Sequence, residues 1–100
     1  MEDLKVPPHS LVAEQSVLGS MIISDTHHYT VVEMISADHF YVQSHSEIYK
    51  AIKILLENKK PVDLLTISDL LESLGTLEYA GGMAYIGELA RNTPTSANVI

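Results

Sequence analysis

The chain has 100 residues, of which 46% are hydrophobic, and six Lys+Arg stand against thirteen Asp+Glu, giving a net charge of −7. This length allows one domain or part of one, which excludes a multi-domain enzyme. This net negative charge repels the phosphate backbone of nucleic acids, so nucleic-acid binding by the domain alone is disfavoured. Because the chain has no cysteine, a disulfide framework, a thiolate nucleophile and a thiolate metal site are also excluded.

Neither a membrane span nor a secretion signal is evident in the sequence. The longest apolar runs, such as residues 21–23 and 54–56, are far shorter than the roughly 20 residues that cross a bilayer as a helix. Residues 1–5 lead into Val6-Pro7-Pro8 without the apolar segment of a signal peptide. We therefore expect a soluble cytoplasmic domain that has no membrane partner.

Two helices are predicted after a short lead-in. Residues 1–9 are polar and contain a proline pair that favours extended chain, so we expect a flexible segment. A helix over residues 11–23, capped by Ser10, has an inward stripe of Leu11, Val17, Leu18, Met21 and Ile22. Asp25 is placed to cap a second helix over residues 26–35, with Tyr29, Val32 and Ile35 inward. A turn over residues 36–41 places Phe40, Tyr41 or both in the core.

The helical spacing of apolar residues predicts three further helices. Ser44 and Glu47 have the spacing of a capping box before a third helix with a stripe of Ile48, Ala51, Ile52, Leu55 and Leu56. A fourth begins after its cap Asp63 and ends at Gly75, with a stripe of Leu64, Ile67, Leu70, Leu71 and Leu74. A tight bend at Gly81-Gly82 precedes a fifth helix over residues 83–91. Its inward-facing residues are Met83, Ile86, Leu89 and Ala90.

The predicted fold class is therefore all-α. No period typical of strands is evident, and no helix is long enough for a coiled-coil seam, so we expect a compact bundle of five to six short helices that cross steeply. Residues 10–94 form its globular part. Residues 95–100 are similar to the start of another helix, and we expect the chain to be a piece of a longer protein that continues there.

Motifs that would carry catalysis or bind a cofactor are missing. Gly81-Gly82 is the only glycine pair, and no glycine-rich phosphate loop occurs. The adjacent His27-His28 would point about 100° apart on a helix and cannot chelate one metal together. The serines lie at caps and helix ends rather than beside a base. We predict no catalytic, cofactor or metal site, and we expect His45 to be packed or hydrogen-bonded.

One acid falls inside an apolar stripe. On a helical projection of residues 11–23, Glu14 lies between Leu11, Val17 and Leu18, and Gln15 lies on the same face. A buried carboxylate must be paired or accept several hydrogen bonds. We expect Glu14 to bind backbone N–H groups of a neighbouring loop, or a cation; a partner-facing acid is the alternative.

Two apolar residues miss the stripes of their helices. Leu65 projects away from the apolar face of the fourth helix, and Tyr85 lies at the margin of the fifth, beside Leu89 and Glu88. A marginal tyrosine is usually a core edge with a hydrated hydroxyl, but tyrosine also anchors protein interfaces. The predicted surface therefore suits a protein partner.

Several sequence fragments form a pattern that extends over nearly the whole chain. They are Pro7-Pro8-His9-Ser10-Leu11-Val12-Ala13-Glu14-Gln15-Ser16-Val17-Leu18-Gly19, Asp38-His39-Phe40-Tyr41, His45, Ile48-Tyr49, Pro61-Val62-Asp63-Leu64-Leu65-Thr66, Gly81-Gly82-Met83-Ala84-Tyr85 and Asn92-Thr93-Pro94-Thr95-Ser96-Ala97-Asn98. In this order and spacing, the fragments resemble the N-terminal domain of the bacterial replicative DNA helicase, the DnaB family.

This resemblance implies a non-catalytic helical head followed by a helical hairpin that begins at residues 95–100. The parent would be a homohexameric, ATP-dependent 5′-to-3′ DNA helicase at the replisome on the nucleoid. Its motor domain, which binds ATP and magnesium and grips DNA, would lie outside this chain. The head would organise the N-terminal collar and dock the C-terminal domain of DNA primase. Without the hairpin we expect a monomer or a weak dimer.

The resemblance also assigns a partner surface. It places Tyr85 on or near the face toward primase, with Glu78 and Glu88 as flanking polar contacts. Family members often have an acid where this chain has Val12, so any acidic contact at that position is missing or replaced here. Ser10, Glu14, Asp63, Gly81 and Gly82 have structural roles as caps, a buried anchor and a bend.

Two other functions compete with this interpretation. A nucleic-acid-binding helical domain would need Arg or Lys along a recognition helix, but the fifth helix has only Arg91. An orphan enzyme would need a cleft with converging titratable groups, and the sequence shows no such set.

Overall fold

The computed structural model describes residues 10–24, 26 and 28–92 as five α-helices and one 3₁₀ turn, with no strand among these residues. The helices are α1 (Leu11–Ile23), α2 (His28–Met34), α3 (Gln43–Glu57), α4 (Leu64–Leu74) and α5 (Gly82–Asn92), with η2 (Ala37–His39) before α3. The all-α class is confirmed. The predicted lead-in, the cap Asp25 and the predicted hairpin start lie outside the described residues.

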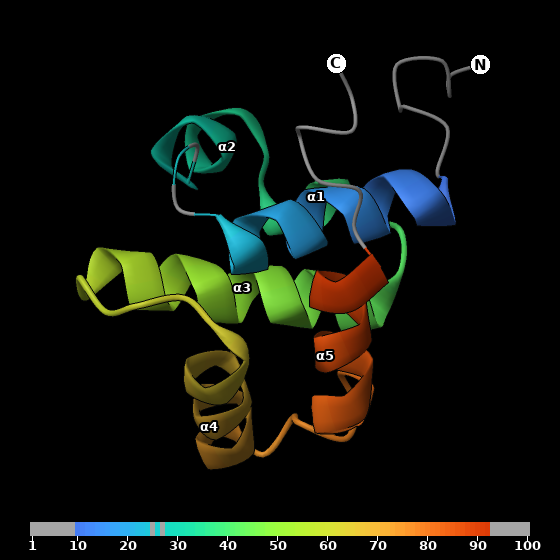
Figure 1. Ribbon diagram of the computed structural model, residues 1–100, viewed down its shortest axis with the longest axis vertical. Helices are drawn as coiled ribbons and strands as arrows, with labels where there is room; N and C mark the ends of the chain where they lie inside the picture. Colours follow the sequence, from blue (N-terminus) through green and yellow to red (C-terminus); the bar gives the residue numbers. More distant parts are fainter. Residues whose placement is uncertain (1–9, 25, 27, 93–100) are drawn as a thin grey trace.

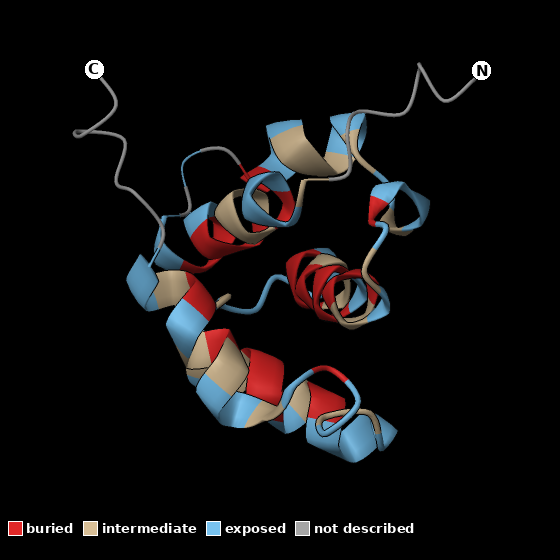
Figure 2. Ribbon diagram, turned by 90° about the vertical axis from the view of Figure 1, so that its right-hand side faces the viewer, coloured by how far each residue is buried: buried red, intermediate tan, exposed pale blue. Residues whose placement is uncertain are grey.

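The central helix α3 holds the bundle together. It lies between α1 on one side and α4 with α5 on the other, and α1 also packs along α5 (Figure 1). Buried positions occur around much of α3, whereas each outer helix buries one face (Figure 2). The buried face of α5 packs mainly against α1 and α4. The fully buried core comprises Leu18, Ile48, Tyr49, Ala51, Ile52, Ile67, Leu71, Ala80 and Ile86.

Two buried polar side chains attach the small helix α2. The His28 ring donates through Nε2 to the Met21 carbonyl over 2.6 Å, and the Tyr49 hydroxyl donates to the Ile35 carbonyl. Burial of the Tyr49 side chain raises the pKa of its hydroxyl. Phe40 is buried against Tyr49, with ring centroids 5.2 Å apart, whereas Tyr41 is exposed, so one of the two predicted aromatics enters the core.

Three predicted helix ends are confirmed. The Ser10 hydroxyl accepts from the Ala13 N–H over 3.1 Å. Asp63 accepts from the Thr66 N–H over 2.9 Å, and α4 ends at Gly75 in the left-handed conformation, with φ of 78°. Each end therefore satisfies backbone groups that a helix terminus leaves without partners.

The predicted capping box of Ser44 with Glu47 is wrong. The third helix begins at Gln43, its N-cap is Val42, and no side chain of the cap bonds to the first turn. The backbone N–H groups of Tyr41 and Val42 instead bind the Glu14 carboxylate of α1. A side chain from another helix therefore anchors this entry in place of a local serine.

Four residues predicted to face inward are exposed. Leu11, Leu74 and Met83 occupy the first or last turns of α1, α4 and α5, where neighbouring helices no longer cover them. Tyr29 of α2 is also exposed, and His28 is the residue that this helix buries instead. Periodicity identified the faces of the helices but not how far along each helix its neighbours extend.

Candidate functional site

The Glu14 carboxylate lies at the junction of α1 with the start of α3. The Glu14 residue is only 9% exposed. Oε2 accepts from the Tyr41 N–H over 2.7 Å and Oε1 accepts from the Val42 N–H over 3.3 Å. These are the loop N–H contacts expected from the helical projection, and they tie α1 to the segment that leads into α3.

His45 continues the contact from Glu14 toward α5. Its ring is fully buried, and Nδ1 lies 2.7 Å from Glu14 Oε1. On the opposite side, Nε2 lies 2.6 Å from the hydroxyl oxygen of Tyr85. The two rings are nearly parallel, with an interplanar angle of 6° and centroids 5.8 Å apart. The Gln15 amide donates to the same Tyr85 oxygen over 3.2 Å. We call Glu14, His45, Tyr85 and Gln15 the polar chain.

The environment of Glu14 favours its ionised form. Burial by itself would raise the pKa of this carboxyl, but hydrogen bonds from His45, Tyr41 and Val42 and the attraction of the His45 ring together lower it below its ordinary value. Glu14 is therefore a carboxylate at neutral pH. Because a carboxylate only accepts hydrogen bonds, the contact with His45 requires a proton on Nδ1.

The bend at Gly81-Gly82 sets the position of the Tyr85 ring. Both glycines have positive φ, 104° and 80°. A Cβ added at Gly81 would lie 2.7–2.9 Å from three carbons of Tyr85, whereas one at Gly82 would meet nothing within 4 Å. The absence of a side chain at Gly81 therefore leaves the space that the tyrosine ring needs.

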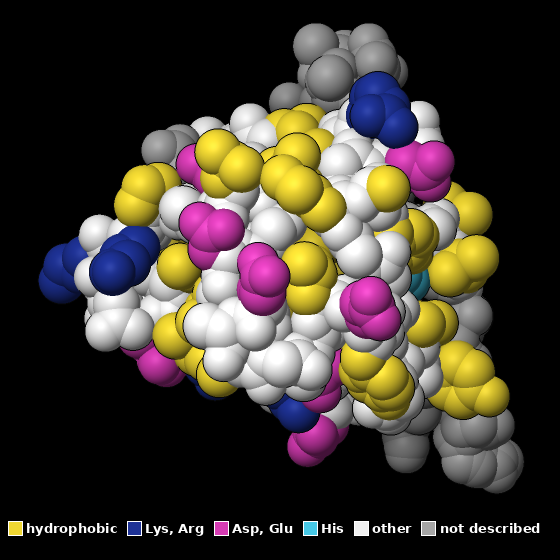
Figure 3. Space-filling view, turned by 90° about the horizontal axis from the view of Figure 1, so that it is seen from below, with side chains coloured by type: hydrophobic (Ala, Val, Ile, Leu, Met, Phe, Trp, Pro, Cys, Tyr) yellow, Lys and Arg dark blue, Asp and Glu magenta, His cyan; other side chains and the backbone are white. Residues whose placement is uncertain are grey.

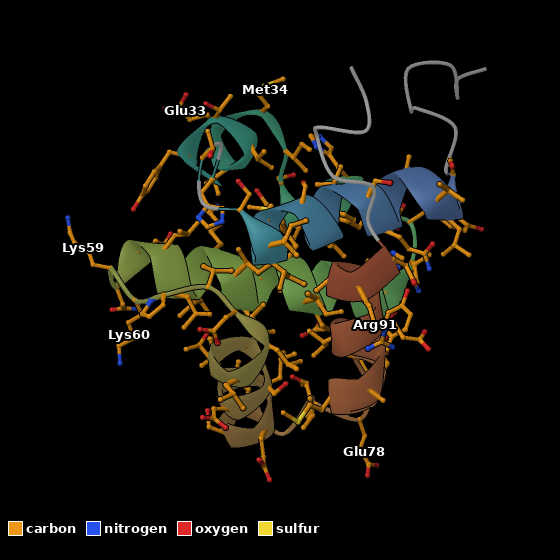
Figure 4. The ribbon with its side chains drawn as sticks, in the orientation of Figure 1. Glu33, Met34, Lys59, Lys60, Glu78 and Arg91 are labelled. Carbon is orange, nitrogen blue, oxygen red and sulfur yellow. The ribbon has the colours of Figure 1, made fainter. Side chains whose placement is uncertain are left out.

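A groove of about 170 Å³ runs between α1 and α5 beside the polar chain. It is lined by Val12, Gln15, Ser16, Tyr85, Glu88, Leu89 and Asn92. The fold thus brings together Val12, Tyr85 and Glu88, three of the four residues predicted for a partner surface. Glu78 is not among them, because its side chain projects from the turn before α5, at the opposite end of that helix from Asn92 (Figure 4).

Four lining residues, Gln15, Ser16, Leu89 and Asn92, were not predicted as partner contacts. Gln15 was placed only on the buried face of its helix, although it also borders the groove. The link between His45 and Tyr85 was missed as well, since 40 residues separate the two rings in the chain. The periodicity of apolar residues within one helix cannot predict a contact between residues so far apart in the sequence.

The polar chain is built to hold helices rather than to react. A carboxylate, an imidazole and a hydroxyl in this order also occur in nucleophilic hydrolases. Here the hydroxyl belongs to a phenol that is bonded on two sides, and the adjoining groove carries the Glu88 carboxylate, which would repel a developing oxyanion. Among the described residues, no group of three His, Asp or Glu side chains is placed to hold a metal.

Replacement of Glu14 by glutamine should destabilise the fold by about 2 kcal/mol, because the added amide donor would face the N–H groups of Tyr41 and Val42. The contribution of Glu14 is present above its unfolded pKa near 4.5 and is lost as pH falls through the lower folded value. Urea unfolding at pH 7 and below pH 4 should therefore show a large difference between wild type and Glu14→Gln at pH 7 that shrinks in acid.

The exposed Glu33 of α2 provides the control. Glu33→Gln should leave the free energy of unfolding within about 0.5 kcal/mol of wild type at both pH values. Equal stability of Glu14→Gln and Glu33→Gln at pH 7 would contradict the assigned contacts.

The two glycines of the bend form a matched pair. Alanine at either position costs about 1–2 kcal/mol, because an L-residue is strained at positive φ. Gly81→Ala should cost more than Gly82→Ala, and it alone should move the ring proton resonances of Tyr85 in NMR spectra. Similar stabilities and an unchanged Tyr85 spectrum in both variants would refute the assigned close approach.

Comparison with known proteins agrees with this fold. A sequence model of the DnaB-like helicase N-terminal domain matches residues 6–100. The crystal structure of the N-terminal domain of DnaB helicase from Mycobacterium tuberculosis superposes with a TM-score of 0.85 at 38% sequence identity, covering 92% of this chain and 67% of that one.

Curated relatives show the same similarity over a small part of their length. The replicative DNA helicase DnaB of Pasteurella multocida is 42% identical over 95 residues, and that of Buchnera aphidicola subsp. Schizaphis graminum is 44% identical over 93 residues. These matches cover 95% and 93% of this chain but only 20% of each relative, so the chain spans about a fifth of their length. With its helical head, its bend and its groove, the chain belongs to the DnaB-like helicase N-terminal domain family.

Proposed function

We propose that this domain is a non-catalytic docking platform of a hexameric replicative DNA helicase. In this role it binds the C-terminal domain of DNA primase and helps to organise the N-terminal collar of the ring. ATP and magnesium are bound, and DNA is unwound, by a motor domain elsewhere in the parent protein. The observation that carries the proposal is the groove between α1 and α5, in which Tyr85 is positioned before any partner arrives.

The state of Tyr85 supports a role in binding. Its ring is half-buried, it borders the groove, and its hydroxyl is bonded on both sides by His45 and Gln15. A side chain that is ordered in the free protein loses little conformational entropy on association. Half-buried aromatic residues in such a position are typical anchors of protein interfaces.

The end of the molecule formed by α4 and α5 supports further contacts with protein. Seen from this side, hydrophobic and acidic side chains alternate over the surface, and Lys and Arg lie toward the margins (Figure 3). The exposed Leu65, Leu74, Tyr79 and Met83 contribute large apolar side chains. We assign this face to neighbours in the collar of the parent protein.

The charge distribution disfavours the alternative of a nucleic-acid-binding domain. Lys59 and Lys60 project from the end of α3, far from Arg91 on α5 (Figure 4). No helix among the described residues presents a continuous basic face, whereas phosphate contacts usually require one. Salt-sensitive binding of DNA by this chain would favour the alternative; we expect none.

We assign the site of action to the replisome, in the bacterial cytoplasm at the nucleoid. Among the residues described, no helix is both long and apolar enough to cross a membrane. The similarity to replicative DNA helicases supports this location, because such enzymes act on DNA during its replication.

Titration with the C-terminal domain of a cognate primase tests the docking proposal. Wild type should bind, and Tyr85→Ala should bind more than about tenfold more weakly, the effect of losing an interface anchor. Tyr85→Phe should fall between them, because it keeps the ring but loses the hydroxyl bonds. Isothermal titration calorimetry gives the affinities, and circular dichroism verifies that each variant is folded.

Tyr29→Ala is the matched control, since Tyr29 is an exposed tyrosine on α2 that does not line the groove. It should bind primase as wild type does. If Tyr29→Ala and Tyr85→Ala weaken binding equally, the groove is not the docking site. If wild type does not bind at all, the docking function itself is wrong.

A further inference from the structure

The hydrogen bonds of the polar chain have one direction. The Glu14 carboxylate accepts, so Nδ1 of His45 carries the proton that it donates to Oε1. We take the ring as neutral, so that its other nitrogen, Nε2, is an acceptor. In this tautomer Tyr85 donates its hydroxyl proton to Nε2, and its oxygen accepts from the Gln15 amide. Every proton in the chain therefore points toward Glu14.

This direction determines what the groove offers to a ligand. The Tyr85 hydroxyl has its proton engaged inside the protein, so toward the groove its oxygen can only accept. Glu88, an exposed carboxylate on the lining, also only accepts. Arg91, the basic residue of α5, is not among the groove residues. Gln15, Ser16 and Asn92 on the same lining also carry donor groups, but the charged group of the lining, Glu88, and the Tyr85 oxygen are hydrogen-bond acceptors.

The apolar part of the lining adds a second requirement. Val12 from α1 and Leu89 from α5 border the same groove. The groove is small, with a volume of about 170 Å³. This space suits one long side chain rather than a whole helix.

We infer that the groove receives a lysine or arginine side chain of the docking partner. The aliphatic stem packs on Val12 and Leu89, and the cationic head donates to Glu88 and to the Tyr85 oxygen. An acidic side chain would be repelled by Glu88, and a purely apolar one would cover that carboxylate without pairing it. The inference rests on the proposed docking function and adds the chemistry of the partner group.

His45 is the positioning residue in this arrangement, since it transmits the acceptor character of Glu14 to Tyr85 without touching the ligand. NMR of the ¹⁵N-labelled histidine rings tests this step without a partner. Wild type and Tyr85→Phe should both show His45 protonated at Nδ1 only, because Glu14 determines the tautomer. A ring protonated at Nε2, alone or together with Nδ1, would overturn the inference, since Tyr85 would then point its proton outward.

Binding to the primase C-terminal domain tests the cation itself. Glu88→Gln should weaken binding about two- to fivefold, as expected for a partly exposed ion pair. It should also reduce the dependence of affinity on salt concentration between about 50 and about 300 mM. Glu72→Gln, at an exposed acid of α4 outside the groove, should change neither quantity.

The outcomes separate the two proposals. If wild type binds primase and Tyr85→Ala does not, but Glu88→Gln retains the affinity and salt dependence of wild type, the basic side chain is refuted and docking stands. If wild type fails to bind, the docking function falls and the inference falls with it.

Discussion

The buried carboxylate of Glu14 is the interaction on which the arrangement of the helices depends. It joins α1 to the two N–H groups before α3 and, through His45, to Tyr85 on α5. Removing a charge of this kind from water is costly, and the cost is recovered only when hydrogen-bond donors surround the charge. Its three donors belong to Tyr41, Val42 and His45, a segment distant in the sequence from α1, so Glu14 has these donors only when α1 and the start of α3 are assembled correctly. The carboxylate therefore specifies the packing as well as stabilising it.

The same constraint connects the interior to the surface. The Tyr85 hydroxyl is hydrogen-bonded to His45 and to Gln15. Its ring packs closely on Gly81, where a side chain would clash with it. Its ring then forms part of a groove whose other lining residues include Val12 and Glu88. In the proposed function, a partner would meet a surface whose shape and hydrogen-bonding character are already set, which lowers the entropic cost of docking.

Sequence reasoning recovered the parts of this structure that depend on local chemistry. The caps Ser10 and Asp63, the stop at Gly75 and the buried position of Glu14 each follow from a residue type and its spacing, and the structure has all of them. Ser44 was misread because the start of α3 is anchored by a carboxylate 27 residues away from Tyr41 rather than by a local side chain. The contact of His45 with Tyr85, and the groove, depend on how α1, α3 and α5 cross. A helical projection contains no information on that crossing.

The central claim is that Glu14 and Tyr85, which do not bond to each other directly, act as one unit through His45. A double-mutant cycle with Glu14→Gln, Tyr85→Phe and the combined variant measures this coupling in the free energy of unfolding. Residues linked in one hydrogen-bond network typically couple by about 0.5–3 kcal/mol, so the combined loss should be smaller than the sum of the single losses by at least about 0.5 kcal/mol. Strictly additive losses would contradict the account.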